Sequence, residues 1–244
     1  MPHRRPRKPP LRVQTTTLWE YPSQHYGDRV QGDQRYVGAT PSWVVWNVIE
    51  RFTGRDALVV DPFCGSGTTL DVASDTGRRA RGFDLAPARA DVERADARVL
   101  PLAPATADLV FMDPPYGDHV RYSDEPDCIG RLSAYEPRYV REMGRAIREA
   151  WRVLRAGGHL ALYCADVWDK QRGFAPVGLQ LCAQIAEVFD LVDVVSVVRH
   201  NKALEQGSHH RAAAEGGFML RGFNYLFLGR KSEGARLGKP RGVR

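Results

Sequence analysis

Short apolar runs alternate with longer amphipathic segments over most of the chain. A run of four to eight apolar residues suits a buried strand, whereas apolar residues repeated every three or four positions suit a helix. The helical pattern is clearest after Pro137, and the Gly157-Gly158 pair is expected to end that helix. We predict helices at 40–52, 68–77, 89–94, 137–154 and 177–189. We predict strands at 57–60, 80–83, 109–112, 160–164, 191–198 and 223–228.

The alternation of strands and helices favours an α/β fold with a doubly wound, mostly parallel sheet and helices on both faces. Thr40-Pro41 reads as a helix start, with Thr40 as the N-cap and the proline at the first helical position. The segment 199–222 is long for a connection between strands, and we treat it as a loop. We expect one domain over 13–230, with basic flexible tails at 1–12 and 231–244.

The positive charge of the chain lies at its two ends. The whole chain carries a net charge of +6, and residues 1–12 and 230–244 each carry +5. The segment 13–229 then has 24 basic residues against 28 acidic ones, so its net charge is −4. Basic tails are typical of solvated flexible segments, and they are also candidates for contacts with phosphate. Charge alone therefore does not predict nucleic-acid binding by the folded part.

Several kinds of site and location are excluded by what the sequence lacks. No apolar run approaches the ~18 residues of a membrane helix, and no signal-peptide segment follows the basic N-terminus. We therefore expect a cytoplasmic protein that has no membrane partner. The four cysteines form no C-x-x-C pair and have no histidine at zinc spacing, so we predict neither a metal site nor a disulfide framework.

A glycine-rich turn, D-P-F-C-G-S-G-T-T from Asp61 to Thr69, follows the predicted strand 57–60 and opens the next helix. At this place an α/β sheet binds nucleotides, because the helix N-terminus presents free backbone N–H groups. Gly65 and Gly67 allow the backbone to approach a ligand closely. The turn lacks the lysine of a P-loop and the third glycine of the dinucleotide fingerprint.

Two acidic residues further along the chain extend this nucleotide site. Asp84 ends the second predicted strand, where a carboxylate can accept hydrogen bonds from both hydroxyls of a ribose. Asp96 lies twelve residues later and could accept a hydrogen bond from an adenine amino group. The order and spacing of these residues favour a nucleotide-like cofactor.

A second motif, D-P-P-Y from Asp113 to Tyr116, follows the predicted strand 109–112. Its two prolines, Pro114 and Pro115, make a rigid turn with few competing conformations. The turn holds a carboxylate, the Pro114 carbonyl and an aromatic ring at the mouth of the sheet. This combination suits an exocyclic amine, since the two oxygens accept its N–H groups while Tyr116 stacks on the ring.

The two motifs together resemble those of the S-adenosylmethionine-dependent amino-methyltransferases. These enzymes methylate adenine N6 or cytosine N4 in DNA, and relatives methylate guanine N2 in RNA. The resemblance covers 40–228 and implies a class I, Rossmann-like fold: a seven-stranded, mostly parallel sheet with a C-terminal antiparallel hairpin. Q-H-Y-G at 24–27 and D-C-I-G at 127–130 also resemble the bacterial and archaeal DNA methylases of this family.

The resemblance implies S-adenosylmethionine as the cofactor and a flipped DNA base as the substrate. No cysteine follows a proline, as cytosine-C5 methylation requires, so direct attack of the amine on the methyl group is expected. The expected catalytic residues are Asp113, Pro114, Pro115 and Tyr116. The expected cofactor-binding residues are Thr40, Pro41, Asp61, Pro62, Phe63, Gly65, Ser66, Gly67, Thr68, Asp84 and Asp96.

Alternatives to DNA methylation stay open. They are an RNA guanine-N2 methyltransferase, a protein-glutamine methyltransferase, which usually has asparagine in place of Asp113, and an inactive subunit that binds cofactor and nucleic acid. No separate target-recognition domain is apparent, so we expect recognition by the acidic loop 117–136 or the basic loop 199–222. The target base, the oligomeric state (a homodimer included) and the existence of a restriction partner also stay open.

Overall fold

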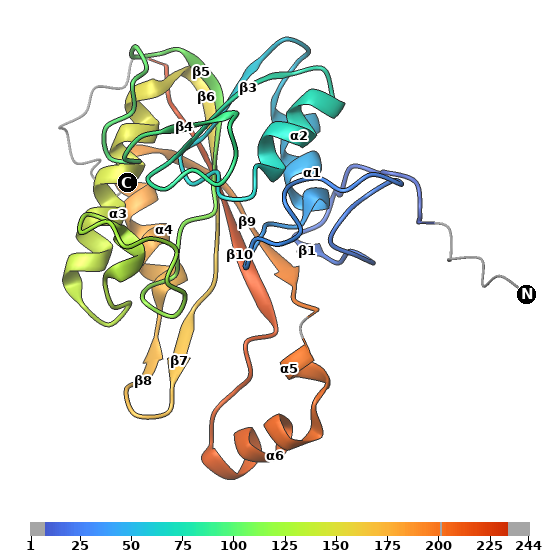
Figure 1. Ribbon diagram of the computed structural model, residues 1–244, viewed down its shortest axis with the longest axis vertical. Coiled ribbons are helices and arrows are strands. Elements are labelled where there is room, and N and C mark those ends of the chain that lie inside the picture. The colour runs from blue at the N-terminus through green and yellow to red at the C-terminus, as the bar shows by residue number, and fades with distance from the viewer. Residues whose placement is uncertain (1–7, 201, 234–244) are drawn as a thin grey trace, which may run out of the picture.

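The computed structural model describes residues 8–200 and 202–233 of the chain, which form a twisted sheet with helices on both faces (Figure 1). The strand order in the main sheet is β1-β9-β10-β6-β5-β2-β3-β4. These strands are β1 (Leu18–Trp19), β2 (Leu58–Asp61), β3 (Arg79–Asp84), β4 (Val92–Arg94), β5 (Ala107–Met112), β6 (Leu154–Cys164), β9 (Asp190–Val198) and β10 (Phe223–Arg230). The short strands β7 (Val167–Asp169) and β8 (Gly173–Ala175) form a separate antiparallel hairpin.

The pairing within the main sheet is mostly parallel. Strands β4, β3, β2, β5 and β6 are parallel to one another, and β10 pairs antiparallel with both β6 and β9. The predicted α/β class, with a C-terminal antiparallel pair, is therefore confirmed. The sheet has eight strands where seven are expected, because the two-residue strand β1 adds to β9 in parallel.

Two helix pairs cover the two faces of the sheet, and each face has its own hydrophobic core. The first core contains side chains of α1 and α2, and the second contains side chains of α3 and α4. Long apolar stripes give these helices their buried faces; in α3, for example, Met143, Ile147 and Ala150 are almost fully buried. These helices are α1 (Ser42–Phe52), α2 (Thr68–Asp75), α3 (Pro137–Val153) and α4 (Val177–Val188).

Two predictions of local structure are wrong. The segment 89–94 contains the edge strand β4 in place of a helix, because β3 offers an open edge where Val92 pairs with Gly82. The Gly157-Gly158 pair does not end α3 either. That helix ends at Val153, Leu154 already pairs with Ala107, and the glycines lie inside β6.

The segment 199–222 contains helices, so its treatment as a loop is also wrong. It holds α5 (Lys202–Glu205) and α6 (Gly207–Gly216), which project on the same side of the molecule as the β7–β8 hairpin (Figure 1). Phe218 stacks on Trp168 of the hairpin with ring centroids 3.7 Å apart. The guanidinium of Arg221 lies 5.2 Å from the ring of Phe174. These contacts pack the segment 199–222 against the β7–β8 hairpin.

The predicted tails are described only in part. Residues 1–7 and 234–244 lie outside the described residues, so the expectation of flexible tails stays a prediction there. Lys231, assigned to the C-terminal tail, is only 8% exposed. Its ammonium donates hydrogen bonds to the carbonyls of Trp151 and Leu154 at the end of α3. Among the helices described, none has the length and apolar character needed to cross a membrane.

Candidate active site

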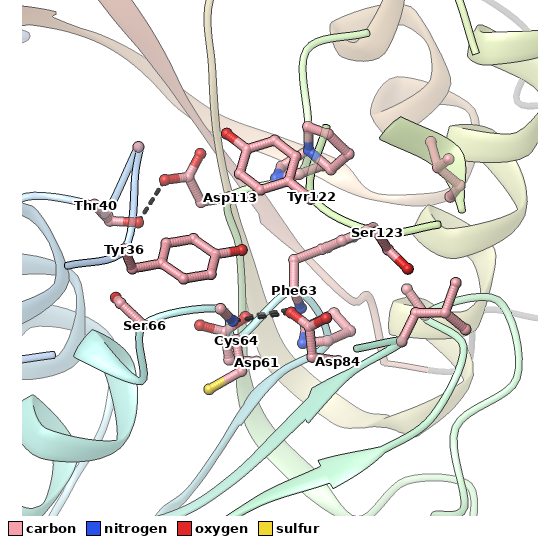
Figure 2. A pocket seen from close by; sticks show the side chains of 18 of the residues that line it. Tyr36, Thr40, Asp61, Phe63, Cys64, Ser66, Asp84, Asp113, Tyr122 and Ser123 are labelled. Carbon is pink, nitrogen blue, oxygen red and sulfur yellow. Dashed lines mark hydrogen bonds between the residues drawn. The ribbon is translucent and has the colours of Figure 1, made fainter. Parts of the chain in front are cut away.

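Two neighbouring parallel strands, β2 and β5, carry the two predicted motifs at their carboxyl ends. Asp61 is the last residue of β2, and Asp113 directly follows β5. The strands pair with Val59 opposite Leu109, so both motifs reach the same edge of the sheet. A pocket of about 970 Å³, partly open to solvent, lies between them (Figure 2). This is the place where open α/β sheets bind ligands.

The pocket brings together nearly all of the predicted site residues. Among its described lining residues there is no lysine, arginine or histidine, whereas several carboxylates face it. Gly67 forms the turn behind the lining, and Pro41 lines a second pocket described below. The predicted residues that line the pocket are Thr40, Asp61, Pro62, Phe63, Gly65, Ser66, Thr68, Asp84, Asp96, Asp113, Pro114, Pro115 and Tyr116.

The glycine-rich turn has a backbone that only glycine adopts readily. Gly65 and Gly67 have φ values of +42° and +78°. A Cβ atom on Gly65 would lie 2.7 Å from the ring of Tyr36, and one on Gly67 would lie 2.5 Å from the guanidinium of Arg89. The ring of Tyr36 thus lies against the bare backbone of the turn, within the pocket (Figure 2). The positive φ values favour glycine at both positions.

Asp84 fastens the glycine-rich turn to the end of β3. Its Oδ2 accepts a hydrogen bond of 3.0 Å from the backbone N–H of Gly65, drawn in Figure 2, and its Oδ1 accepts one of 2.9 Å from that of Ala86. Each carboxylate oxygen keeps a further lone pair. The Asp84 carboxylate is therefore positioned by backbone groups and can still accept hydrogen bonds from a ligand in the pocket.

Asp96 lies at the far end of the pocket and is paired with Arg98. The guanidinium donates to both carboxylate oxygens, with Nε to Oδ1 at 2.9 Å and Nη2 to Oδ2 at 2.6 Å. Burial opposes ionisation of Asp96, but the hydrogen bonds from Arg98 prevail and lower its pKa. The pairing holds an ionised carboxylate in the lining of the pocket.

Asp61 is a buried carboxylate, only 4% exposed, at the floor of the pocket. It accepts hydrogen bonds from the Thr69 hydroxyl at 2.5 Å and from the backbone N–H of Phe63 at 3.0 Å. Burial raises the pKa of Asp61 to about 7, and the nearby charges of Asp113 and Asp84 add to this effect. A cation bound beside these three carboxylates would offset their mutual repulsion.

Asp113 is held by two hydroxyl groups from different parts of the chain. Thr40 Oγ1 donates to Oδ2 at 2.5 Å, as Figure 2 shows, and Tyr116 Oη donates to Oδ1 at 2.7 Å. Burial raises the pKa of Asp113 to about 6, although these two hydrogen bonds act in the opposite direction. Thr40 therefore does not cap α1 as predicted; Pro41 occupies the cap position, without a side-chain hydrogen bond.

The D-P-P-Y turn is held from below by a residue that the sequence analysis missed. The hydroxyl of Tyr139, in α3, donates a hydrogen bond of 2.8 Å to the carbonyl of Pro115. Tyr139 is fully buried, so this bond is shielded from water. The sequence pattern of α3 gives no indication of this hydrogen bond between Tyr139 and the D-P-P-Y turn.

Two further tyrosines of the pocket were also missed as site residues. Tyr36 and Tyr122 stack with ring centroids 5.9 Å apart, and both line the pocket. They come from irregular segments far apart in the sequence, so no local pattern marks them. By contrast Asp127, Cys128 and Ile129, which also line the pocket, belong to the D-C-I-G stretch that the family resemblance had singled out.

A second pocket lies on the other side of Asp113. It shares Gly38, Ala39, Asp113 and Tyr116 with the first pocket. The rest of its wall comes from the N-terminal segment and from the ends of β6, β9 and β10. These residues are Tyr21, Pro22, Ser23, Gln24, Pro41, Tyr163, Val197, Val198, Arg199, His200 and Asn224. The carboxylate of Asp113 thus forms part of the boundary between two hollows.

The acidic loop 117–136 has much of its charge neutralised by arginines. The guanidinium of Arg94 donates to Glu125 at 2.5 Å, and that of Arg121 donates to Asp124 at 2.5 Å. The backbone carbonyl of Asp127 accepts a hydrogen bond from Arg98. Two acidic side chains of the loop are therefore paired within the protein, whereas Asp127 lines the first pocket.

Comparisons with known proteins match part of the chain, which includes the glycine-rich turn. Residues 3–93 match the model of a family described as DNA methylase. A type II methyltransferase of Streptomyces caespitosus, M.ScaI, is 32% identical over 78 residues, which are 31% of this chain and 26% of that protein. The matched part therefore spans about a quarter of the relative's length.

Solved structures with a similar fold support the architecture. The structure of TrmN from Thermus thermophilus has a TM-score of 0.52 at 21% identity, over 80% of this chain and 50% of that chain. The structure of the cyclase SpnF has a TM-score of 0.53 at 17% identity, over 84% and 89% of the two chains. The family match over residues 3–93 includes the glycine-rich turn and bears out the resemblance to the amino-methyltransferases for that part of the chain, whereas the D-P-P-Y turn lies outside the matched residues.

Proposed function

We propose that this chain transfers a methyl group from S-adenosylmethionine to the exocyclic amine of a base flipped out of DNA, either adenine N6 or cytosine N4. The observation that carries this proposal is the position of Asp113 and Tyr116 in the walls of both pockets. A cofactor in the first pocket and a base in the second would meet at these two side chains. The family match and the M.ScaI relative support DNA as the substrate.

The first pocket fits S-adenosylmethionine by the chemistry of its lining. The cofactor carries positive charge on its sulfonium and ammonium groups, and the pocket presents carboxylates without basic side chains among its described lining. Asp61 would face the ammonium group, Asp84 would accept from the ribose hydroxyls, and Asp96 would accept from the adenine amine. Phe63 supplies an apolar surface, and the backbone of Gly65 lines the pocket beside the ring of Tyr36.

The second pocket would hold the target base against the D-P-P-Y turn. In this proposal the carboxylate of Asp113 and the carbonyl of Pro114 accept hydrogen bonds from the two amine N–H groups. Tyr116 presents its ring for stacking, which is worth about 1–3 kcal/mol per base. Its hydroxyl bond to Asp113 fixes the ring and the carboxylate together. Pro115 and Tyr139 keep the turn rigid through the bond between them.

The chemistry of this chain's own residues is mainly positioning and charge stabilisation. S-adenosylmethionine, when bound, supplies an electrophilic methyl group on a sulfonium centre. Asp113 raises the electron density on the amine nitrogen by accepting its N–H. The nitrogen would gain the methyl group as the bond between that carbon and the sulfonium sulfur breaks, which would leave the cofactor as a neutral thioether. The nitrogen would also lose one proton, which the Asp113 carboxylate accepts and passes to water. A pKa of about 6 lets Asp113 release that proton at neutral pH.

Replacement of Asp113 tests this proposal. We expect Asp113→Ala to keep the affinity for S-adenosylmethionine within a few-fold of wild type while turnover on DNA falls by at least about 100-fold, as general acid–base groups typically contribute. Asp193→Ala is a matched control, because Asp193 is exposed and lines neither pocket. Undiminished turnover in Asp113→Ala would overturn the assignment.

A further inference from the structure

Two segments form a projecting lobe at the edge of the sheet that carries both motifs (Figure 1). They are 167–175, which contains the β7–β8 hairpin, and the described part of 199–222, which contains α5 and α6. The first follows the end of β6 at Cys164, and the second follows the end of β9 at Val198. Strand β6 is parallel to β5, and β10 is antiparallel to both β6 and β9, so these ends lie at the edge where Asp113 follows β5. The projecting lobe therefore starts beside the candidate active site.

The projecting lobe contributes directly to the wall of the second pocket. Arg199 and His200 are the first residues of its longer segment, and both line that pocket together with Asp113 and Tyr116. The longer segment is also held to the hairpin by the Phe218–Trp168 stack described above. A nucleic acid with one base in the second pocket would therefore have its neighbouring nucleotides next to the lobe.

The net charge of the projecting lobe is opposite to that of the rest of the segment 13–229. The lobe contains six lysines and arginines against three acidic residues, a net charge of +3. The remainder of 13–229 has 18 basic residues against 25 acidic ones, a net charge of −7. The other segment expected to take part in recognition, 117–136, has two basic residues against five acidic ones. Of these parts of the chain, only the lobe has a charge that complements a polyanion.

The projecting lobe also exposes apolar side chains beside a guanidinium group. Met219 is 77% exposed, the highest fraction among the large apolar side chains described, and Phe174 is 50% exposed. Arg221 connects the two, since its Nη2 donates to the Met219 carbonyl at 2.6 Å and its guanidinium lies 5.2 Å from the Phe174 ring. Neighbouring exposed apolar groups are typical of interaction surfaces, and proteins that distort DNA present such groups to unstacked bases.

Resting on the proposed function, we propose that the projecting lobe binds duplex DNA on both sides of the flipped base. Its basic side chains contact the phosphates, and Met219 and Phe174 face the bases that flipping leaves unstacked. Phosphate contacts fix the position of the duplex without reading its sequence, so they hold the target nucleotide at the second pocket. The lobe thereby supplies the attraction for DNA that the acidic remainder of 13–229 lacks.

The test compares two double variants that remove the same charge from opposite edges of the sheet. Lys170→Gln/Arg211→Gln places one substitution in each segment of the lobe, at exposed residues of the hairpin turn and of α6. Arg55→Gln/Arg230→Gln is the control, because both residues are exposed, Arg55 precedes β2 and Arg230 ends β10. The measurements are the Kd for a mixed-sequence DNA duplex at several salt concentrations, the Kd for S-adenosylmethionine, methyl transfer and thermal unfolding.

The lobe variant should lose affinity for DNA, and the loss should depend on salt. We expect duplex binding to weaken ~10- to 100-fold at physiological salt, and the slope of log K against log salt to become shallower by roughly 2, since each lost phosphate contact contributes about 0.9. The control variant should bind within ~3-fold of wild type, because charges further than about 8 Å from the duplex are screened at this ionic strength. The Kd for S-adenosylmethionine should stay unchanged in both variants.

The contrary results are distinct. Wild-type duplex affinity in the lobe variant, or an equal loss in both double variants, would overturn the proposal. Tighter binding of the lobe to an RNA hairpin than to duplex DNA would assign it to RNA and would also overturn the proposal. The same holds for a wild-type dimer that Met219→Ser dissociates in sedimentation, since the apolar side chains would then belong to a contact with a second copy.

Two further arrangements keep the test decisive. If the double lobe variant does not fold, Lys170→Gln and Arg211→Gln are measured singly, each with about half the expected change in slope. Methyl transfer to DNA with unchanged binding by the lobe variant would overturn the role of the lobe alone. Duplex binding that the lobe variant loses, without methyl transfer by the wild type, would overturn the proposed function alone.

Discussion

The hydroxyl of Thr40 donates a hydrogen bond of 2.5 Å to Oδ2 of Asp113 and so joins the segment before α1 to the end of β5. The bond spans 73 positions of sequence and connects a residue expected to bind the cofactor with the expected catalytic carboxylate. Thr40 lines the first pocket, and Asp113 lines both pockets. The bond therefore connects a residue of the first pocket to the carboxylate that the two pockets share.

Removing this hydrogen bond should shift the pH dependence of the reaction. The ionised form of Asp113 is the acceptor, so the rate falls as the pH drops through its pKa of about 6. Thr40→Val removes a donor that stabilises the carboxylate, and the pKa of Asp113 should rise. A hydrogen bond to a charged group is worth about 1.5–3 kcal/mol, so the acid limb of the pH–kcat/KM profile should move up by roughly one to two pH units. Thr40→Ser should restore the wild-type profile; a valine variant with an unshifted acid limb would contradict the coupling.

The affinity for S-adenosylmethionine should increase as the pH rises through the pKa of Asp61. Burial raises that pKa to about 7, and only the ionised carboxylate attracts an ammonium group. If binding requires ionised Asp61, the Kd should fall roughly tenfold between pH 6.0 and pH 7.5. Calorimetry in two buffers of different ionisation enthalpy measures both the Kd and the protons released.

Asp61→Asn is the control for this pH dependence. The amide keeps the shape of the side chain and cannot ionise, so binding should be weaker and nearly independent of pH over that range. A wild-type Kd that does not change with pH would show that Asp61 does not face the ammonium group. An unchanged pH dependence in Asp61→Asn would place the titrating group elsewhere.

Lys231 should contribute measurably to stability despite its place near the end of the described chain. Its ammonium donates to the Trp151 and Leu154 carbonyls at 2.7 and 2.6 Å and lies 3.8 Å from the centroid of the Trp151 ring. Lys231→Met keeps the apolar stem but leaves the carbonyls without this donor, so we expect a loss of about 1–3 kcal/mol. For a chain of this size that is roughly 2–12 °C in Tm.

The exposed residue Lys170 provides the comparison for Lys231. Lys170→Met removes the same charge at the surface and should change Tm by less than about 2 °C, as surface substitutions usually do. Equal Tm values for the two variants in thermal unfolding would contradict the account of Lys231 as a partner of the helix end.

The sequence predicted the parts of the fold and the site that depend on local pattern. The D-P-F-C-G-S-G-T-T and D-P-P-Y turns each follow an apolar strand, so their meeting at one sheet edge could be expected from parallel topology alone. The edge strand β4 could not be expected, because its three residues are held by pairing with β3 and not by their own pattern. The helices within 199–222 are packed against the β7–β8 hairpin, a long-range contact that no local signal shows.

Long-range contacts also explain why several site residues could not be predicted from the sequence. Tyr36, Tyr122 and Tyr139 act through contacts with residues distant in sequence. Thr40 looked like a helix cap, because threonine before proline commonly starts a helix, yet its hydroxyl has a stronger partner in the Asp113 carboxylate.

The central claim is methyl transfer to a base amine in DNA, and one measurement addresses it directly. Wild-type protein is incubated with S-adenosylmethionine labelled in its methyl group and with unmethylated DNA, tRNA or rRNA, and the labelled nucleosides are then identified. We predict label in DNA, as N6-methyladenine or N4-methylcytosine, and none when Asp113→Ala replaces the wild type. Label confined to RNA, or label in DNA that persists in Asp113→Ala, would contradict the account.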